Sequence, residues 1–248
     1  MAPDPFYARG DHFGIDLAGA HVVFTTRRGG ASTGPYESMN LGRLTDDRPE
    51  AVRHNRAALE SELGVTLAHI RQVHGTDVRL VTEQPVEPAD PDQLPRVDGH
   101  ATALAGVGPM VLVADCLPVA VAGDGAVAML HAGWRGLAGG ILAEGVAAVR
   151  ELGATGPLRA AIGPGAGPCC YEVGEDVHSV FAEQGLDVRD GRNLDLKEIA
   201  RAQLERAGVD AVHDLGLCTI CADPSLLFSH RRDQGITGRQ AGIAWLSR

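Results

Sequence analysis

Two reactive side chains stand at the open end of a strongly apolar hairpin sequence. Residues 114–136 read ADCLPVAVAGDGAVAMLHAGWRG, and small apolar residues fill most of the stretch between Cys116 and His131. The Asp-Gly pair at 124–125 is typical of a two-residue hairpin turn. With that turn, Pro118 lies opposite His131, so Cys116 and His131 are diagonal neighbours on one face, about 7–8 Å apart along the backbone. A shift of one residue in register would put them on opposite faces.

A thiolate and an imidazole on one face can bind a single Zn²⁺ ion. His74, which follows a short apolar run in RQVHGTDV, offers a third donor. Two histidines and one cysteine would leave the fourth position of a tetrahedral zinc ion open to water, whose pKa the metal lowers to about 7. Spacing alone does not select His74, because the chain contains 10 histidines.

Two other interpretations of the hairpin residues remain open at this point. An unpaired cysteine is commonly a small buried packing residue, and His131 could be a buried histidine that caps its strand. Alternatively, Cys116 and His131 could form a nucleophile and its base, with Asp115 as the orienting acid.

The other four cysteines form two close pairs. Cys218 and Cys221 have the C-x-x-C spacing of zinc knuckles and redox sites, whereas Cys169 and Cys170 are adjacent. Because a second C-x-x-C pair is missing and an adjacent pair is a poor replacement, the sequence disfavours a structural zinc site there. The N-terminus has no basic start followed by an apolar run, so we expect reduced thiols in a cytoplasmic protein.

The overall charge and hydropathy exclude several classes of protein. The chain has 22 lysines and arginines against 32 acidic residues, a net charge of -10, which argues against a nucleic-acid-binding surface. No segment approaches the roughly 18 apolar residues of a membrane span, so we expect no membrane partner. Hydrophobic residues make up 44% of the chain but aromatic residues only 4%, so aliphatic side chains must fill the core.

Helical and strand-like patterns mix without a strict βαβ rhythm, which predicts an α+β fold with a mixed or antiparallel sheet. Strand patterns occupy 21–26, 69–82, 109–130 and 158–165, and helical patterns occupy 49–64, 136–152, 172–185 and 194–208. The first helix is expected to begin at a proline and to end at Gly64. We expect one domain over 1–248, with 1–19 as a loose N-terminal extension.

Three further segments lack a clear helical pattern. The stretch 83–99 is rich in proline and acidic residues, which predicts a solvated surface loop. Residues 101–106 predict a short helix or turn, and 216–248 predict strand, loop and strand.

Arginines offer candidate anion sites. Arg27 and Arg28 follow a strand and precede two glycines, where guanidinium and backbone N–H groups could bind an anion or simply form a solvated turn. Arg56, within the first predicted helix, is by default a surface residue. The glycine-rich stretch 163–167 lacks the spacing of a nucleotide-binding loop.

Longer motifs occur in order along the chain. They are RRGGASTGPYESMNLG, NRAAL, QVHGTDV, VADCLPV, HAGWRG, IGPGAGPCCYEVG, DLKEIARAQL and CTICADPSLLFSHRRDQGITGRQAGIAW. From about residue 20 onward they resemble the laccase-domain family, also called the polyphenol oxidase or peptidoglycan editing factor family. The resemblance implies an α+β fold of two packed mixed β-sheets with helices on the outer faces (α/β/β/α layers). It also implies one zinc ion, held by His74, Cys116 and His131.

The resemblance implies an activity as well. Similar members phosphorolyse adenosine, inosine and methylthioadenosine and deaminate adenosine, so nucleosides and phosphate are the expected partners. The residues expected to act in catalysis are Cys116, Arg56, Asn40 and Asp115, and those expected to bind substrate are Arg27 and Gln72. Asp115 is expected in a supporting role, because alternation along a strand points it away from Cys116.

Other functions remain as alternatives. Cys116 and His131 could form a hydrolase acting on peptidoglycan precursors, or the chain could be a binding module without turnover. A polyphenol oxidase would need several copper ions, which is disfavoured because the sequence contains no His-x-His motif.

Overall fold

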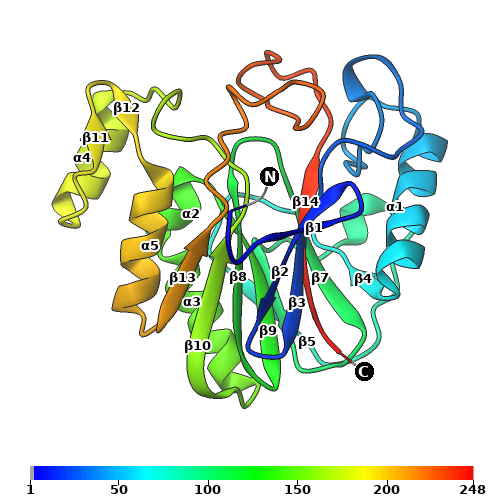
Figure 1. The fold of residues 1–248 in the computed structure, drawn as a ribbon, viewed down its shortest axis with the longest axis horizontal. Helices are drawn as coiled ribbons and strands as arrows, with labels where there is room; N and C mark the ends of the chain where they lie inside the picture. Colours follow the sequence, from blue (N-terminus) through cyan, green and yellow to red (C-terminus); the bar gives the residue numbers. More distant parts are fainter. Residues whose placement is uncertain (1–2, 248) are drawn as a thin grey trace.

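The computed structural model describes residues 3–247 and consists mainly of two six-stranded β-sheets packed face to face (Figure 1). In spatial order, the first sheet contains β1 (Tyr7–Arg9), β2 (His12–Leu17), β3 (Ala20–Phe24), β14 (Gln240–Leu246), β7 (Val107–Val113) and β4 (Thr66–Ala68). The second contains β13 (Ala211–Asp214), β10 (Thr155–Ile162), β8 (Leu117–Asp124), β9 (Ala126–Ala132), β6 (Gly99–Thr102) and β5 (Val78–Val81). Both sheets are mixed, because β4–β7, β5–β6 and β10–β13 are parallel pairs and the other pairs are antiparallel. A short separate hairpin pairs β11 (Arg189–Asp190) with β12 (Asn193–Leu194).

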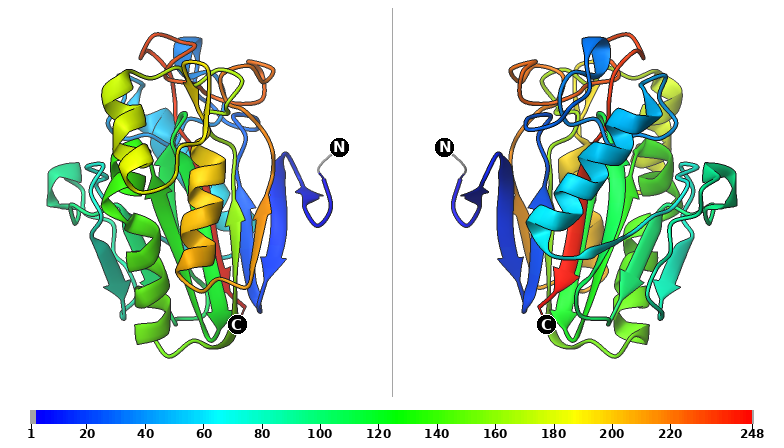
Figure 2. Two further views of the ribbon diagram at one scale, coloured as in Figure 1. Left: turned by 90° about the vertical axis from the view of Figure 1, so that its left-hand side faces the viewer. Right: turned by 90° about the vertical axis from the view of Figure 1, so that its right-hand side faces the viewer.

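Helices cover the two outer faces of this sandwich. The first sheet is covered by α1 (Pro49–Leu63), and the second by α2 (Trp134–Gly139), α3 (Ile141–Glu151), α4 (Glu175–Glu183) and α5 (Leu196–Arg206). The two views of Figure 2 show α5 in front of one face and α1 in front of the other. Two single-turn 3₁₀ helices lie in loops, η1 (Gly34–Tyr36) and η2 (Pro91–Gln93). The predicted α+β architecture of two mixed sheets with outer helices is therefore confirmed.

Strands β8 and β9 form the centre of the second sheet and are buried on both faces. Ala120 and Met129 point between the sheets, whereas Val119 and Leu130 point toward the helices. Burial on both faces explains why these strands read as continuous apolar runs rather than alternating patterns. Helix α3 packs so closely that a Cβ atom on Gly145 would lie 2.2 Å from Cδ1 of Leu130.

The hairpin turn and its register are as predicted. Gly123 pairs with Ala126 around the two-residue turn, in which Gly125 has a φ of 90°. Pro118 lies opposite His131. The turn therefore sets the register that puts the open end of the hairpin at the candidate site.

The helix predictions are largely confirmed. Helix α1 begins at Pro49, and Gly64 ends it in the left-handed conformation with a φ of 69°. Helices α4 and α5 lie within the predicted ranges 172–185 and 194–208. The predicted helix 136–152 is divided at Gly140, whose φ of 95° separates α2 from α3.

Four segments differ from the predictions. Of the strand predicted over 69–82, only β5 (Val78–Val81) forms. Residues 7–17, expected within a loose extension, instead form β1 and β2 at the edge of the first sheet. Part of 101–106 belongs to β6 rather than to a helix or turn, because it pairs with both β5 and β9. The segment 215–239 contains no strand at its start, since β13 ends at Asp214 and the chain re-enters a sheet only at β14. Among the described residues, no helix is both long and apolar enough to cross a membrane.

Candidate metal centre

The open end of the β8–β9 hairpin brings three possible metal donors together. Cys116 immediately precedes β8, His131 lies near the end of β9, and His74 comes from the segment before β5. Their donor atoms all lie within 4.8 Å of one another. Cys116 Sγ is 3.9 Å from His74 Nε2, and the two imidazole centroids are 4.8 Å apart in an edge-to-face arrangement.

Asp98 holds both histidines in place. Its carboxylate is fully buried, and Oδ1 lies 2.8 Å from Nδ1 of His131. The same carboxylate accepts the backbone N–H groups of Val73, His74 and Gly75 at 2.6–3.2 Å. These bonds stabilise His74 in the left-handed conformation with a φ of 61°, which a residue with a side chain rarely adopts. One carboxylate therefore sets the backbone of one donor and the ring orientation of another.

The close packing of these groups shifts their acidities. Burial alone would raise the pKa of Asp98, but hydrogen bonds from His131 and Gly75 outweigh it and hold this pKa below its usual range. Burial would likewise lower the pKa of His131, yet the neighbouring Cys116 and Asp98 raise it to about 9. The pKa of the Cys116 thiol falls to about 6, because the two histidines outweigh the effect of burial. The group thus stabilises the thiolate, the form of cysteine that binds metals.

The donor set fits a zinc ion. With Zn–S near 2.3 Å and Zn–N near 2.0 Å, tetrahedral geometry requires a sulfur–nitrogen separation of about 3.6 Å, close to the 3.9 Å between Cys116 and His74. Asp98 occupies Nδ1 of His131 and leaves Nε2 as its donor, in the pattern by which carboxylates orient metal-binding histidines. His131 is buried while His74 is exposed, so the group is accessible from the His74 side.

The carboxylate of Asp115 bonds residues of a neighbouring loop rather than the three metal donors. Its φ of 96° breaks the strand between β7 and β8. Its Oδ1 accepts the hydroxyl of Thr219 at 2.6 Å, and its Oδ2 accepts the N–H of Arg231 at 2.7 Å. The backbone carbonyl of Asp115 also accepts the N–H of Ala166. The residue expected to act in catalysis thus has both carboxylate oxygens bonded to the loop 215–239 and its backbone carbonyl bonded to the loop that carries Ala166.

Asn40 and Gln72 are also occupied by structural hydrogen bonds. Asn40 Nδ2 donates to Thr45 and Asp47, and its Oδ1 accepts the N–H groups of Gly42 and Arg239. Gln72 bonds the backbone N–H and carbonyl of Leu112 through both ends of its amide, each at 2.8 Å. All four hydrogen-bonding positions of the Asn40 amide are filled, whereas Gln72 keeps one amide N–H group and one acceptor lone pair in addition to its two bonds to Leu112.

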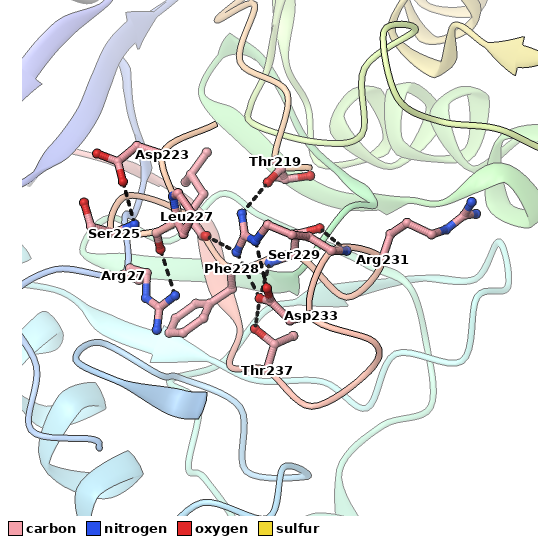
Figure 3. Close-up of polar contacts among 12 residues, drawn as sticks. Arg27, Thr219, Asp223, Ser225, Leu227, Phe228, Ser229, Arg231, Asp233 and Thr237 are labelled. Atoms are coloured by element: carbon pink, nitrogen blue, oxygen red, sulfur yellow. Dashed lines mark hydrogen bonds and ion pairs between the residues drawn. The ribbon is translucent and has the colours of Figure 1, made fainter. Parts of the chain in front are cut away.

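Arg56 and Arg27 are both engaged in contacts with other parts of the protein, away from the metal donors. Arg56 is buried, donates to the carbonyl of Leu41 and forms an ion pair with Glu87. Arg27 donates to the carbonyls of Glu37 and Pro224 and stacks over the Phe228 ring at 4.3 Å (Figure 3). The two arginines stabilise loops, and no contact in the described residues joins either of them to the three metal donors.

Two other arginines and a tyrosine lie closer to Cys116 than the sequence indicated. Burial lowers the pKa of Arg239, while Cys116, Asp115 and Tyr36 are near enough to oppose that shift. The pKa of Tyr171 rises to about 12 through burial and the charge of Cys116, and Arg231 stacks over its ring at 5.2 Å. Both arginines lie in the loop 215–239, where no periodic pattern marks them. Tyr171 belongs to the CCYEVG motif and Arg239 to the TGRQ motif, which are the only sequence signals that pointed to this region.

Comparison with known proteins identifies the family. A family model described as multi-copper polyphenol oxidoreductase laccase matches residues 21–247. The chain belongs to this laccase-domain family.

Relatives of known name and structure span almost the whole chain. A Xylella fastidiosa protein named purine nucleoside phosphorylase is 42% identical, over 92% of this chain and 93% of its own. A Streptomyces coelicolor protein with the same name is 41% identical, over 92% and 96%. The crystal structure of the Bacillus licheniformis protein YfiH superimposes with a TM-score of 0.90 at 32% identity, covering 98% of this chain and 100% of that one. YlmD from Geobacillus stearothermophilus superimposes with a TM-score of 0.85 at 33% identity, over 99% and 100%.

The several copper ions that the name of the family model implies do not match the donors of this chain. Within residues 3–247, two groups of three or more candidate donors lie close enough to share an ion. One contains two histidines and the other contains none, whereas multicopper centres need clusters of many histidines. The donors therefore fit single-ion sites.

Proposed function

We propose that this protein is a zinc-dependent purine nucleoside phosphorylase. One observation carries the proposal: a His-Cys-His metal group lies near a half-buried arginine, Arg239, in a chain whose near full-length relatives are named purine nucleoside phosphorylase. Adenosine, inosine and methylthioadenosine are the substrates that the family resemblance implies. In the reaction, a phosphate oxygen attacks C1′ of the ribose, and the bond to the purine nitrogen breaks with its electron pair leaving on the base.

Arg239 is the residue best placed to bind the phosphate. Its Nη1 donates to the carbonyls of Thr237 and Gly238, which fixes the guanidinium. Among residues 3–247, Nε and Nη2 make no hydrogen bond to the protein. An immobilised guanidinium binds phosphate oxygens through paired N–H groups. Because Gln240 pairs with Val113, Arg239 lies beside the segment that leads to Cys116, and a phosphate bound there would be near the metal group.

A candidate binding surface for the purine lies just beyond the end of β9, where Trp134 follows His131 by three residues. Trp134 and Tyr171 line a cavity of about 390 Å³, together with Arg231. Aromatic faces of this kind stack on purine rings. Because the raised pKa of Tyr171 keeps its phenol protonated, the hydroxyl can donate a hydrogen bond to a ring nitrogen of the leaving base. When bound, Zn²⁺ at the His74–Cys116–His131 group supplies a Lewis acid with an open coordination position.

Deamination of adenosine is the secondary activity in this proposal. The His-Cys-His donor set is similar to the sets of zinc deaminases, which also use a carboxylate as acid and base. Here the two nearest carboxylates, Asp98 and Asp115, are engaged by hydrogen bonds. Phosphorolysis needs no such carboxylate, so we expect it to dominate.

A cysteine hydrolase is the second candidate, and one observation favours it. Asp98, His131 and Cys116 form a row of carboxylate, imidazole and thiolate, which is the arrangement of a nucleophile with its base and orienting acid. Bound metal would occupy the thiolate and exclude this role. Metal content therefore separates the two candidates.

The assay is product analysis of the metal-loaded protein with adenosine or inosine, with and without phosphate. We expect free base and ribose 1-phosphate when phosphate is present, and little inosine from adenosine. The matched control is Cys116→Ala, which should lose both zinc at this group and base release. Zinc-loaded protein that releases no base with phosphate would refute the proposal.

A further inference from the structure

The remaining four cysteines lie together in a second cluster, formed by Cys169, Cys170, Cys218 and Cys221. Strands β10 and β13 are parallel neighbours, so the loops that follow them leave the same edge of the sheet. The four sulfur atoms all lie within 4.8 Å of one another. Cys169 Sγ is 3.4 Å from Cys170 Sγ and 3.5 Å from Cys221 Sγ. The four sulfur atoms therefore converge, although the sequence disfavoured an adjacent pair as the replacement for a second C-x-x-C pair.

Two tight turns explain how the sulfurs converge. The N–H groups of Cys170 and Tyr171 both donate to the carbonyl of Gly167, so the chain turns and neighbouring side chains no longer point to opposite sides. In the second loop, the N–H of Ala222 donates to the carbonyl of Cys218 and closes the C-x-x-C turn. In an extended chain, adjacent thiols would point to opposite faces. The turn lets the thiols of Cys169 and Cys170 point to the same site.

Two hydrogen bonds from backbone N–H groups hold the two cysteine-bearing loops together. The N–H of Thr219 donates to the carbonyl of Gly165 at 3.0 Å, and the N–H of Gly167 donates to Sγ of Cys218 at 3.3 Å. A Cβ atom on Gly167 would lie 3.1 Å from Cβ of Cys218 and 3.5 Å from Sγ of Cys169. Glycine at this position is therefore what allows the first loop to approach the sulfurs so closely.

We propose that Cys169, Cys170, Cys218 and Cys221 bind a second zinc ion. Four thiolates around Zn²⁺, with bonds near 2.3 Å, place the sulfurs about 3.8 Å apart, close to the separations between Cys169 and its two neighbours. A disulfide would require about 2.05 Å between its sulfurs. Four thiolates in tetrahedral geometry are the donor set of structural zinc sites, whose four positions are filled by protein.

This ion would connect the loop that follows β10 to the loop that follows β13, next to the first metal group. Thr219, next to Cys218, donates its hydroxyl to Asp115, which directly precedes Cys116. The segment 215–239 is long and has no helix or strand, and Arg232 stabilises it by contacts to Thr219, Leu227 and Asp233 (Figure 3). A zinc ion at its start would fix the loop that carries Arg231 and Arg239. The inference does not rest on the proposed activity, because none of its ligands belongs to the first group.

The test is zinc content, measured by elemental analysis of protein purified without chelator, with parallel mapping of alkylated cysteines by mass spectrometry. Wild-type protein should hold about two zinc ions per chain. The variant C169S/C221S should hold about one, and C116A should also hold about one, because all five cysteines belong to one group or the other. The four cluster thiols of the wild type should resist alkylation until a strong chelator is added.

The outcomes separate the two sites. Equal zinc content in wild type and C169S/C221S would overturn the second site, as would a Cys169–Cys221 disulfide or iron in the purified wild type. A loss of zinc in C116A together with no loss in C169S/C221S would leave the first group as the zinc site and would overturn the second. The alkylation map of the wild type tests the proposal even if the double variant does not fold.

Discussion

Asp98→Asn is the substitution that most sharply tests how the metal donors are positioned. The aspartate accepts the N–H groups of Val73, His74 and Gly75 and pairs with Nδ1 of His131. An asparagine of the same shape keeps one accepting oxygen and replaces the other by an NH₂ donor. In either orientation of the amide, at least one backbone N–H group faces a donor instead of an acceptor.

The magnitudes follow from that geometry. Each lost hydrogen bond to a charged acceptor is worth about 1.5–3 kcal/mol, so the free energy of unfolding of the metal-free protein should fall by about 2–4 kcal/mol. Carboxylates that orient metal-binding histidines contribute about 10–100-fold to metal affinity, and we expect the zinc affinity of the first group to fall by that factor. Urea unfolding measures the first quantity, and competition with a chromophoric chelator measures the second.

Asp223→Asn is the matched control. Asp223 also accepts a backbone N–H group in a loop, that of Ser225 at 2.8 Å, but it is exposed and lies outside both metal groups. Both quantities should stay close to the wild-type values in this variant. If zinc affinity and stability in Asp98→Asn were as close to the wild-type values as those expected for Asp223→Asn, the role assigned to Asp98 would be refuted.

Three further predictions concern stability and substrate binding. Burial lowers the pKa of His69 and of His100 to about 3, so each contributes stability that is present above pH 6.5 and is lost as pH falls toward 3. Between pH 6.5 and 5 the loss is about 2 kcal/mol per histidine, and urea unfolding of metal-free His100→Gln should show a correspondingly weaker pH dependence; an equal dependence would contradict this. Arg239→Met should raise KM for phosphate about 10–100-fold with little change in KM for the nucleoside, whereas the exposed Arg53→Met should change neither, as initial-rate kinetics will show. Leu130→Ala should lower the free energy of unfolding by about 2–5 kcal/mol, because Leu130 is fully buried under α3; a loss under 1 kcal/mol would refute that packing.

The hairpin was predictable from sequence because its signals are local. A two-residue Asp-Gly turn fixes the register, and the register fixes which side chains share a face. Cys116 and His131 follow directly from that argument. His74 did not, because its position depends on contacts between segments far apart in the chain, and only the family resemblance selected it.

Asp98 was missed because its surroundings in the sequence are misleading. It ends a stretch rich in proline and acids, a composition typical of solvated loops. Its burial results from the pairing of β6 with β9, which places Asp98 beside His131, and from the N–H of His131 bonding the Asp98 carbonyl at 2.7 Å. These contacts join segments far apart in the sequence, so no rule based on residue spacing predicts them.

The backbone at Asp115 and at the adjacent cysteines differs from the extended chain that the sequence arguments assumed. Both predictions assumed extended chain, in which neighbouring side chains alternate. The left-handed φ of Asp115 and the turn at Cys169–Cys170 each interrupt that alternation. Aspartate is among the residues that tolerate the left-handed region, but tolerance alone does not predict where a strand breaks.

The most direct test of the proposed function is zinc-dependent recovery of phosphorolysis. Protein stripped of metal by a chelator should release no base from inosine and phosphate, and activity should return in proportion to Zn²⁺ added back. His74→Ala, which leaves all four cluster cysteines intact, should not recover. Full activity in the metal-free wild type, or equal recovery in His74→Ala, would contradict the assignment of His74, Cys116 and His131 as the catalytic metal group.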